Sequence, residues 1–212
     1  MEKTAGKFIV IEGLDGSGKT VKSKILADHL KGLGLKVNLS FEPTNGPVGA
    51  IIRQVLVGRL QVDSKTLAAL YAADRLDHIT NPINGILKHL KDGIIEICDR
   101  YDLTSYAYQT LFVDEKWVWQ LNSQAIRPDL TIFLDVDPEE CRHRLSRSRV
   151  DEEMFHDLAH LREARSKYLA AIDALKDHEQ IVIVDSNGDL QQVSKKVIDE
   201  ATSFLRREGT IL

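Results

Sequence analysis

Residues 13–20 have the spacing G-x-x-x-x-G-K-T, which is typical of loops that bind nucleotide phosphates. Glycines allow successive backbone N–H groups to curl around a polyphosphate, and the positive end of the following helix dipole adds to the attraction. Within this loop, Lys19 is expected to reach the β- and γ-phosphates, and the Thr20 hydroxyl is expected to ligate Mg²⁺. The predicted ATP-binding residues are therefore Gly13, Leu14, Asp15, Gly16, Ser17, Gly18, Lys19 and Thr20.

Further charged residues follow other apolar runs of the chain. Glu42 comes directly after the run 36–41, and Asp99 and Arg100 stand at the end of the run 94–99. Charged groups at such positions are costly to bury, so they are expected to pair with each other or to bind a ligand. For Asp99 and Arg100, a structural ion pair is the alternative to a role near Mg²⁺ and near the acceptor of a phosphoryl group.

Short apolar runs alternate with longer helical patterns along the chain. Three of the runs are almost continuously apolar, as parallel strands that are buried on both faces should be. The alternation predicts an α/β fold in three layers, in which helices flank a five-stranded parallel sheet and the functional edge lies at the carboxyl ends of the strands. The expected strands are Phe8–Glu12, Lys36–Phe41, Ile94–Asp99, Leu130–Val136 and Gln180–Asp185.

Capping residues mark several of the expected helices. Asn81-Pro82 is expected to open a helix over Ile83–Lys91, and Asp137-Pro138 repeats that device. Two shorter segments, Val48–Leu56 and Leu67–Tyr71, have apolar faces that could serve the core or an interface. The other expected helices are Gly18–Lys31, Glu139–Arg147, Phe155–Lys176 and Asp189–Arg207.

The composition places the chain among ordinary globular proteins. Its 212 residues are 43% hydrophobic and 28% charged, which favours one large domain. The net charge of −4 gives no basic field that would recruit nucleic acid. Cys98 and Cys141 have no metal-ligand spacing, and so few cysteines favour a reducing compartment. Since no signal peptide or membrane-spanning run is evident, we expect a cytoplasmic protein without a membrane partner.

The chain resembles the thymidylate kinase family, whose members phosphorylate dTMP with ATP. The combination of DR at 74–75, DRY at 99–101 and RPDLTIFLDV at 127–136 is specific to that family. The resemblance implies a single kinase domain with the three-layer P-loop fold over 1–212, a role in dTTP synthesis, Mg²⁺ as cofactor, ATP and dTMP as substrates, and a homodimer. The matching segments, which span essentially the whole chain, are IEGLDGSGKT, FEP, YAADR, DRY, SYAYQ, RPDLTIFLDVDPEE and RSKYL.

The resemblance also implies roles in binding the acceptor nucleoside. Asp15 would lie beside the acceptor sugar, and Tyr108 would crowd its 2′ position. Arg75 would donate to a thymine carbonyl, while Tyr71, one helical turn earlier, would stack on the base. The family usually has phenylalanine at the position of Tyr71. Core packing is the alternative reading for both tyrosines.

A second group of residues would hold phosphate and metal. The resemblance implies that Arg100 binds the dTMP phosphate, that Asp99 supports the Mg²⁺ and phosphate network, and that Arg53 adds a phosphate contact. The predicted Mg²⁺ ligands are Thr20, Asp15 and Asp99. The predicted acceptor-binding residues are Asp15, Glu42, Arg53, Tyr71, Arg75, Asp99, Arg100, Ser105 and Tyr108.

The stretch 142–149 is rich in arginine and is predicted to begin a lid over about 143–155. Glu140 can pair with Arg144 one helical turn later, but no such partner accounts for Arg147 and Arg149. Members of the family carry a catalytic arginine in the phosphate loop or basic residues in the lid. Since position 16 is glycine, the chain resembles the lid type. The predicted catalytic residues are Lys19, Asp15, Arg100, Arg147 and Arg149, with Arg149 favoured in the lid.

Some features leave alternatives open. Thr110–Trp117 replaces a glycine-rich segment of the family, so the contacts on the sugar side of the acceptor stay open. His156 and His160 have the spacing of a zinc-protease helix, but Asp157 replaces the catalytic glutamate, so we expect surface histidines. The alternative functions are a deoxynucleoside kinase, another nucleoside monophosphate kinase, and a non-enzymatic phosphate-loop switch.

Overall fold

The computed structural model describes residues 6–147 and 157–211. Five strands form one sheet in the order β2-β3-β1-β4-β5, and each neighbouring pair is parallel. Each strand agrees with its expected range to within one residue at either end, which confirms the predicted sheet. The strands are β1 (Phe8–Gly13), β2 (Val37–Phe41), β3 (Ile95–Asp99), β4 (Leu130–Asp135) and β5 (Ile181–Asp185).

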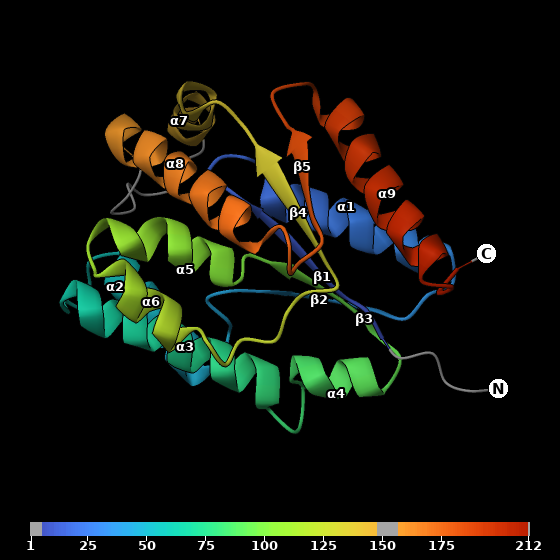
Figure 1. The fold of residues 1–212 in the computed structure, drawn as a ribbon, viewed down its shortest axis with the longest axis horizontal. Coiled ribbons are helices and arrows are strands. Elements are labelled where there is room, and N and C mark those ends of the chain that lie inside the picture. The colour runs from blue at the N-terminus through green and yellow to red at the C-terminus, as the bar shows by residue number, and fades with distance from the viewer. Residues whose placement is uncertain (1–5, 148–156, 212) are drawn as a thin grey trace.

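Helices cover both faces of this sheet (Figure 1). One face is packed against α1 (Lys19–Gly32) and α9 (Leu190–Arg207). The other face is packed against α5 (Asp102–Tyr108), α8 (Leu158–Leu175) and α4 (Ile86–Lys91). The three-layer α/β architecture expected from the sequence is therefore confirmed.

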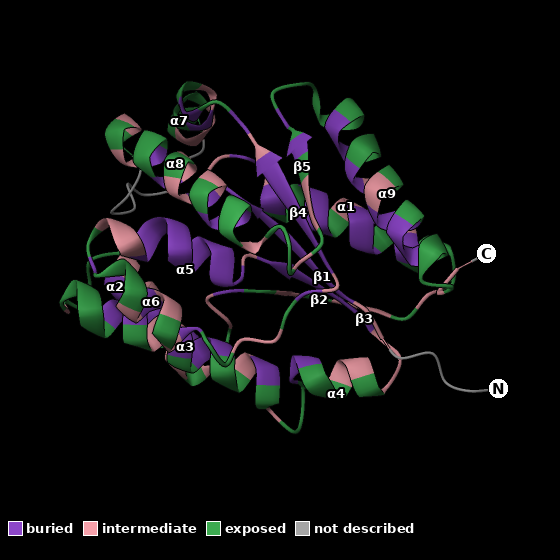
Figure 2. Cartoon of the chain, in the orientation of Figure 1, coloured by how far each residue is buried: buried purple, intermediate pink, exposed green. Residues whose placement is uncertain are grey.

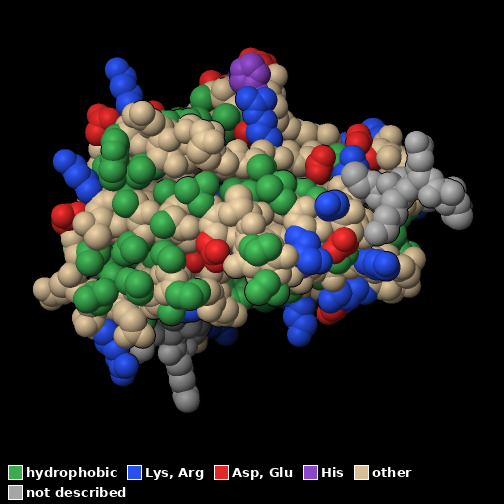
Figure 3. Space-filling model, turned by 90° about the horizontal axis from the view of Figure 1, so that it is seen from below, with side chains coloured by type: hydrophobic (Ala, Val, Ile, Leu, Met, Phe, Trp, Pro, Cys, Tyr) green, Lys and Arg blue, Asp and Glu red, His purple; other side chains and the backbone are tan. Residues whose placement is uncertain are grey.

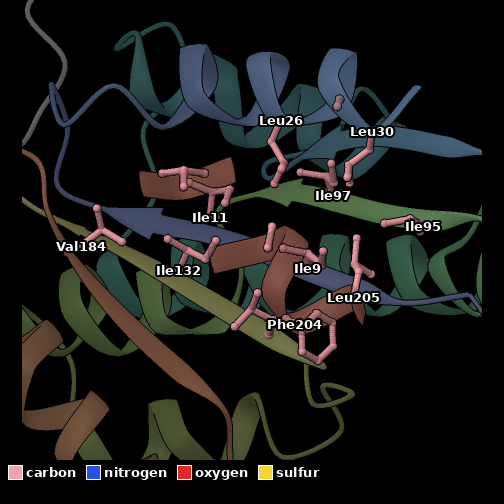
Figure 4. Packing of buried hydrophobic residues seen from close by; sticks show 14 of the residues in the cluster. Ile9, Ile11, Leu26, Leu30, Ile95, Ile97, Ile132, Val184, Phe204 and Leu205 are labelled. Atoms are coloured by element: carbon pink, nitrogen blue, oxygen red, sulfur yellow. The ribbon is translucent and has the colours of Figure 1, made fainter. Parts of the chain in front are cut away.

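The central strand β1 shows why the sheet has continuous apolar runs. Ile9 and Ile11 point into the cluster that contains Leu26 of α1 and Phe204 of α9 (Figure 4). Phe8 and Val10 of β1 belong to the cluster on the opposite face. Side chains of a strand alternate between faces, so a strand covered on both sides needs apolar residues at nearly every position. Figure 2 shows the resulting buried centre.

Four further helices and one 3₁₀ turn complete the described part of the fold. Helices α2 (Pro47–Leu56) and α3 (Ser64–Thr80) pack on each other through a separate apolar cluster that includes Ile52, Val55 and Leu67. Helix α7 (Pro138–Arg147) follows β4. The short helix α6 (Glu115–Leu121) and the 3₁₀ turn η1 (Gln109–Leu111) occupy the segment that departs from the family pattern.

The expected starts of two helices are confirmed, one cannot be compared with the described residues, and one is wrong. Pro138 opens α7, and Asp189 caps α9 by accepting from the backbone N–H of Gln192 at 2.9 Å. Helix α8 begins at Leu158, and the predicted start at 155 lies outside the described residues. The predicted helix over Ile83–Lys91 begins only at Ile86, because α3 continues to Thr80 and Asn81 ends it. Asn81 Oδ1 then accepts from Ile83 N at 3.0 Å, which stabilises a turn.

Among residues 6–147 and 157–211, none of the helices has both the length and the apolar character that a membrane span requires. Cys98 and Cys141 are both free and buried.

Candidate active site

The phosphate loop joins β1 to α1 and is shaped by glycines. Gly16 and Gly18 have positive φ angles of 82° and 86°, a backbone region that favours glycine. The Lys19 side chain curls back over the loop, and its ammonium donates to the carbonyls of Gly13 at 2.8 Å and Leu14 at 2.7 Å. Burial, together with the like charge of Arg100, lowers the pKa of Lys19 to about 8. A cation is therefore already held inside the loop where phosphate oxygens are expected.

Helix α7 packs directly on the phosphate loop at Gly16. An ideal Cβ on Gly16 would lie 2.6 Å from the Cys141 carbonyl oxygen and 3.1 Å from Cγ of Leu145. No side chain fits at this position without displacing α7. The loop therefore has no room for an arginine at this position, and the catalytic role of the lid arginines stays a prediction.

Thr20 and Asp99 meet at the carboxyl ends of β1 and β3. The Thr20 hydroxyl donates to Asp99 Oδ2 at 2.5 Å. The other carboxylate oxygen, Oδ1, is buried and has no hydrogen-bond partner among the described residues. Hydroxyl and carboxylate oxygens are the ligands that phosphate-loop proteins offer to Mg²⁺. The donor set and the unsatisfied oxygen therefore fit a hydrated divalent cation.

Arg100 follows β3 and lies beside the phosphate loop. Its Nη2 atom donates to Asp15 Oδ1 in a direct ion pair. Burial alone would lower the pKa of Arg100, but the Asp15 carboxylate raises it well above its usual value. The Arg100 backbone has φ of 73°, which is rare for residues other than glycine. The structure thus contains the Asp15–Arg100 pair rather than the Asp99–Arg100 pair considered from the sequence.

A cavity of about 510 Å³ opens beside Arg100 and is lined largely by apolar side chains. Its lining brings together several of the predicted site residues from four parts of the chain. Tyr108 accepts from the backbone N–H of Asp15 at 3.1 Å, which ties the cavity wall to the phosphate loop. Burial and the nearby Asp15 carboxylate raise the pKa of Tyr108 well above its usual value, so the phenol stays neutral. The predicted residues in the lining are Asp15, Arg53, Tyr71, Arg100 and Tyr108.

Arg75 and Ser105 are absent from this lining and lie behind it. The Arg75 side chain is 2% exposed, and its Nε donates to Glu42 Oε2 at 2.9 Å. Its two Nη atoms bind Glu42, Ser105 Oγ at 3.1 Å, the Asn122 side chain and the Tyr101 carbonyl at 2.9 Å. Four hydrogen bonds and the ion pair with Glu42 thus already occupy the guanidinium. Recognition of a base by Arg75 stays a prediction, and it requires one of these bonds to be exchanged.

Glu42 faces a second, smaller cavity instead of the larger one. This cavity of about 290 Å³ is lined by Thr20, Asp99 and Glu42 among others, and it shares Phe41 and Arg100 with the larger cavity. Glu42 also contacts His78 Nδ1 at 3.1 Å, and its direct partners are therefore protein groups. Its predicted contact with the acceptor nucleotide remains untested.

The larger cavity also contains residues that were not among the predicted site residues, and three of them stand out. Gln109 is 9% exposed, and its Oε1 has no partner among the described residues. Phe112 lies in the segment 110–117, and its ring is 5.6 Å from the ring of His160. His160 therefore belongs to the cavity wall rather than to an open surface. The sequence signal for Gln109 was its place in SYAYQ, and that for Phe112 was its place in the departing segment Thr110–Trp117, whereas His160 had been expected at the surface.

A buried carboxylate joins the phosphate-loop strand to α5. Glu12 is fully buried and accepts from the backbone N–H groups of Tyr101 at 2.7 Å and Thr104 at 3.1 Å. It also accepts from the hydroxyls of Thr104 at 2.7 Å and Tyr168 at 3.0 Å. This network fixes the start of α5 relative to the phosphate loop, and it thereby positions the neighbouring Arg100.

The predicted lid is described only at its beginning. Residues 143–147 form the end of α7, where Arg147 is exposed. Arg149 and the remainder of the lid to 155 lie outside the described residues. Arg165, the first residue of the RSKYL segment, forms a bidentate ion pair with Asp135 at 2.7 and 2.8 Å. That pair already accounts for Arg165.

Comparisons with known proteins agree with this geometry. A family model described as thymidylate kinase matches residues 11–197. A probable thymidylate kinase of Methanocaldococcus jannaschii is 38% identical over 192 residues, which cover 90% of this chain and 93% of that protein. A thymidylate kinase of Desulfotalea psychrophila is 42% identical over 153 residues, covering 72% of this chain and 74% of that protein. A probable thymidylate kinase of Methanococcus aeolicus is 37% identical over 199 residues, with 91% and 94% coverage.

Proposed function

This chain belongs to the thymidylate kinase family, and from that premise we propose that it transfers the γ-phosphoryl group of ATP to dTMP, giving dTDP and ADP. The observation that carries the proposal is the placement of Arg100. Its guanidinium lies beside the phosphate loop and also lines the cavity of about 510 Å³. One cation therefore stands where a bound donor and a bound acceptor would meet.

The cavity has the properties that a pyrimidine deoxynucleotide needs. Tyr71 offers an aromatic face for the base, and Tyr108 offers a fixed wall beside the sugar. Arg53 and Arg100 supply positive charge for the acceptor phosphate. The carbonyls of Pro43 and Thr44 already accept from Arg53, which holds its guanidinium at the cavity.

We place Mg²⁺ at Thr20 and Asp99, and we assign Asp15 to the same site once Arg100 turns from it to a phosphate. The unsatisfied Asp99 Oδ1 supports this assignment. Bound there, the ion would neutralise charge on the β- and γ-phosphate oxygens.

The proposed mechanism rests on positioning and electrostatics. The acceptor is a phosphate monoester whose second pKa is about 6, so it is already ionised at neutral pH and needs no strong base. Lys19 binds the donor phosphates, Arg100 holds the acceptor phosphate, and Arg147 and Arg149 of the lid stabilise charge on the transferring group. Lid closure would also exclude water, which competes with dTMP for the γ-phosphoryl group.

We also propose a homodimer formed through the outer sides of α2, α3 and α4. Figure 3 shows apolar side chains gathered on the side of the molecule where these helices lie. Ile51 is 42% exposed, Leu76 40%, Ile83 80% and Leu87 47%. Pairing these surfaces in a second copy would bury them. A cytoplasmic location remains a prediction and is supported by the two free cysteines.

Coupled ADP release with Mg·ATP tests the proposed function against a panel of dTMP, dUMP, dCMP, AMP and thymidine. We expect the highest kcat/KM with dTMP. A preference for thymidine would indicate a deoxynucleoside kinase, and a preference for dCMP or AMP would contradict the assignments of Tyr71 and Arg75. ADP release that no acceptor stimulates would favour a phosphate-loop switch.

A further inference from the structure

Lys22 is a buried cation beside the phosphate loop with no role in the site described so far. It lies one helical turn after Gly18 on α1, and the residue is only 6% exposed. Its side chain runs back toward the start of the helix, as helical side chains do. An ideal Cβ on Gly18 would lie 2.6 Å from the Lys22 Nζ. The ammonium therefore occupies the space beside Gly18, on the first turn of α1.

No carboxylate forms an ion pair with Lys22 in the part of the chain that the structure describes. The charge that acts on it most is Arg144 of α7, which has the same sign. Burial and this like charge lower the pKa of Lys22. Arg144 itself is held by Glu140 Oε1 at 2.7 Å and by the Ser186 carbonyl at 3.3 Å. The stem of Lys22 is thus buried, while its ammonium lies beside the phosphate loop with a second cation nearby and no carboxylate partner among the described residues, so an anion bound there would face two positive charges.

We propose that Lys22 is a further donor-binding residue, whose ammonium contacts the polyphosphate of ATP at its α-phosphate end. This inference rests on the proposed function for the identity of the donor. Loop N–H groups bind the α- and β-phosphates, while the loop lysine reaches the β- and γ-phosphates. Lys19 points inward to the Gly13 and Leu14 carbonyls, so it serves the terminal end. The Lys22 ammonium lies beside Gly18 instead, so we assign it to the α-phosphate end of the donor.

Charge balance supports the same assignment. The Mg·ATP complex carries a net charge of about −2 at neutral pH, and Lys19 can offset only one of these charges. Lys22 supplies the second without movement of the backbone, because Gly18 leaves room for its ammonium. Glycine at position 18 is thus required twice, for its positive φ of 86° and for the space that Lys22 fills.

Lys22→Met tests the proposal, because methionine keeps the unbranched stem and removes the charge. We expect the Kd of Mg·ADP, measured by titration calorimetry, to rise about tenfold, which is the loss of one charge-assisted hydrogen bond. The KM for ATP should rise similarly while the KM for dTMP stays unchanged. Lys22→Arg should retain most of the affinity. Lys24→Met is the matched control, since Lys24 is exposed on the same helix.

Thermal melting separates this role from a structural one. Without nucleotide, Lys22→Met should melt at the same or a higher temperature, because the repulsion between Lys22 and Arg144 is removed, while its stabilisation by Mg·ADP should shrink. A folded Lys22→Met protein that binds Mg·ADP within twofold of the parent overturns the proposal. If that variant does not fold, Lys22→Gln is measured against the same criterion. Since the titration contains no acceptor, it stays decisive even if the substrate panel rejects dTMP.

Discussion

Replacing Gly16 by alanine should destabilise the fold and weaken donor binding, because α7 touches the phosphate loop at that residue. Two costs add at this position. Gly16 has φ of 82°, and the left-handed region costs a residue with a Cβ about 1–2 kcal/mol. The new Cβ would also lie 2.6 Å from the Cys141 carbonyl oxygen, and overpacking of this kind costs about 1–3 kcal/mol. We therefore expect a total loss of about 2–5 kcal/mol.

Gly34→Ala is the matched control for the backbone contribution. Gly34 has the same φ of 82°, but an added Cβ there has no neighbouring atom within 4 Å. It should therefore cost only about 1–2 kcal/mol. The difference between the two variants isolates the contact between α7 and the loop.

Urea unfolding, followed by the fluorescence of Trp117 and Trp119, gives both free energies of unfolding. Calorimetry with Mg·ADP then reports whether displacement of α7 also distorts the loop. We expect weaker binding for Gly16→Ala and unchanged binding for Gly34→Ala. Equal losses of stability in the two variants would show that α7 yields freely at Gly16, and the explanation for the missing loop arginine would fail.

Three further changes probe the acceptor side, the lid and a buried carboxyl. Arg100→Ala should raise the KM for dTMP by about 100-fold through loss of charge-assisted hydrogen bonds, whereas unaltered acceptor affinity would leave only a structural ion pair with Asp15. Arg149→Ala should lower kcat by about 100-fold or more with little change in the KM for dTMP, and an unchanged kcat would remove the lid assignment. Burial raises the pKa of the Asp102 carboxyl to about 7. Between pH 4 and 7 the unfolded chain therefore loses this proton while the folded chain keeps it, and the free energy of unfolding falls as the pH rises. At pH 8 the Asp102→Asn variant should therefore be more stable than the parent, by at most about 4 kcal/mol, and this difference should shrink toward zero near pH 4. A difference in the free energy of urea unfolding that does not change with pH would contradict this explanation.

The strands and the phosphate loop could be predicted from the sequence because their signals are local. A doubly covered strand such as β1 needs apolar residues on both faces, and this requirement appears directly in the sequence. Helix α5 had no such signal. Every residue from Asp102 to Tyr108 is buried, so the helix has no polar face and therefore no amphipathic period. Asn81 was misread because an asparagine suits the turn after a helix as well as the cap before one.

Some contacts of the candidate site could likewise be predicted from the sequence, and others could not. Thr20 and Asp99 could be predicted to meet, since both follow the carboxyl ends of neighbouring parallel strands. The burial of Arg75 could not be predicted, because its partners come from several separate segments of the chain. His160 reaches the cavity through packing against Phe112, a contact between residues far apart in the sequence.

At Arg100 the left-handed backbone conformation lowers the stability of the fold, while the arginine side chain is the one proposed to hold the acceptor phosphate. Glycine or asparagine would adopt its φ of 73° at lower cost, whereas arginine costs about 1 kcal/mol there. Replacing Arg100 would relieve this cost but also remove the ion pair with Asp15, so a directed-evolution experiment that selects only for heat resistance keeps arginine only where the ion pair is worth more than the backbone strain. A selection that also demands phosphoryl transfer would retain it. A residue other than arginine found at position 100 after such an experiment therefore indicates that activity was not selected together with heat resistance.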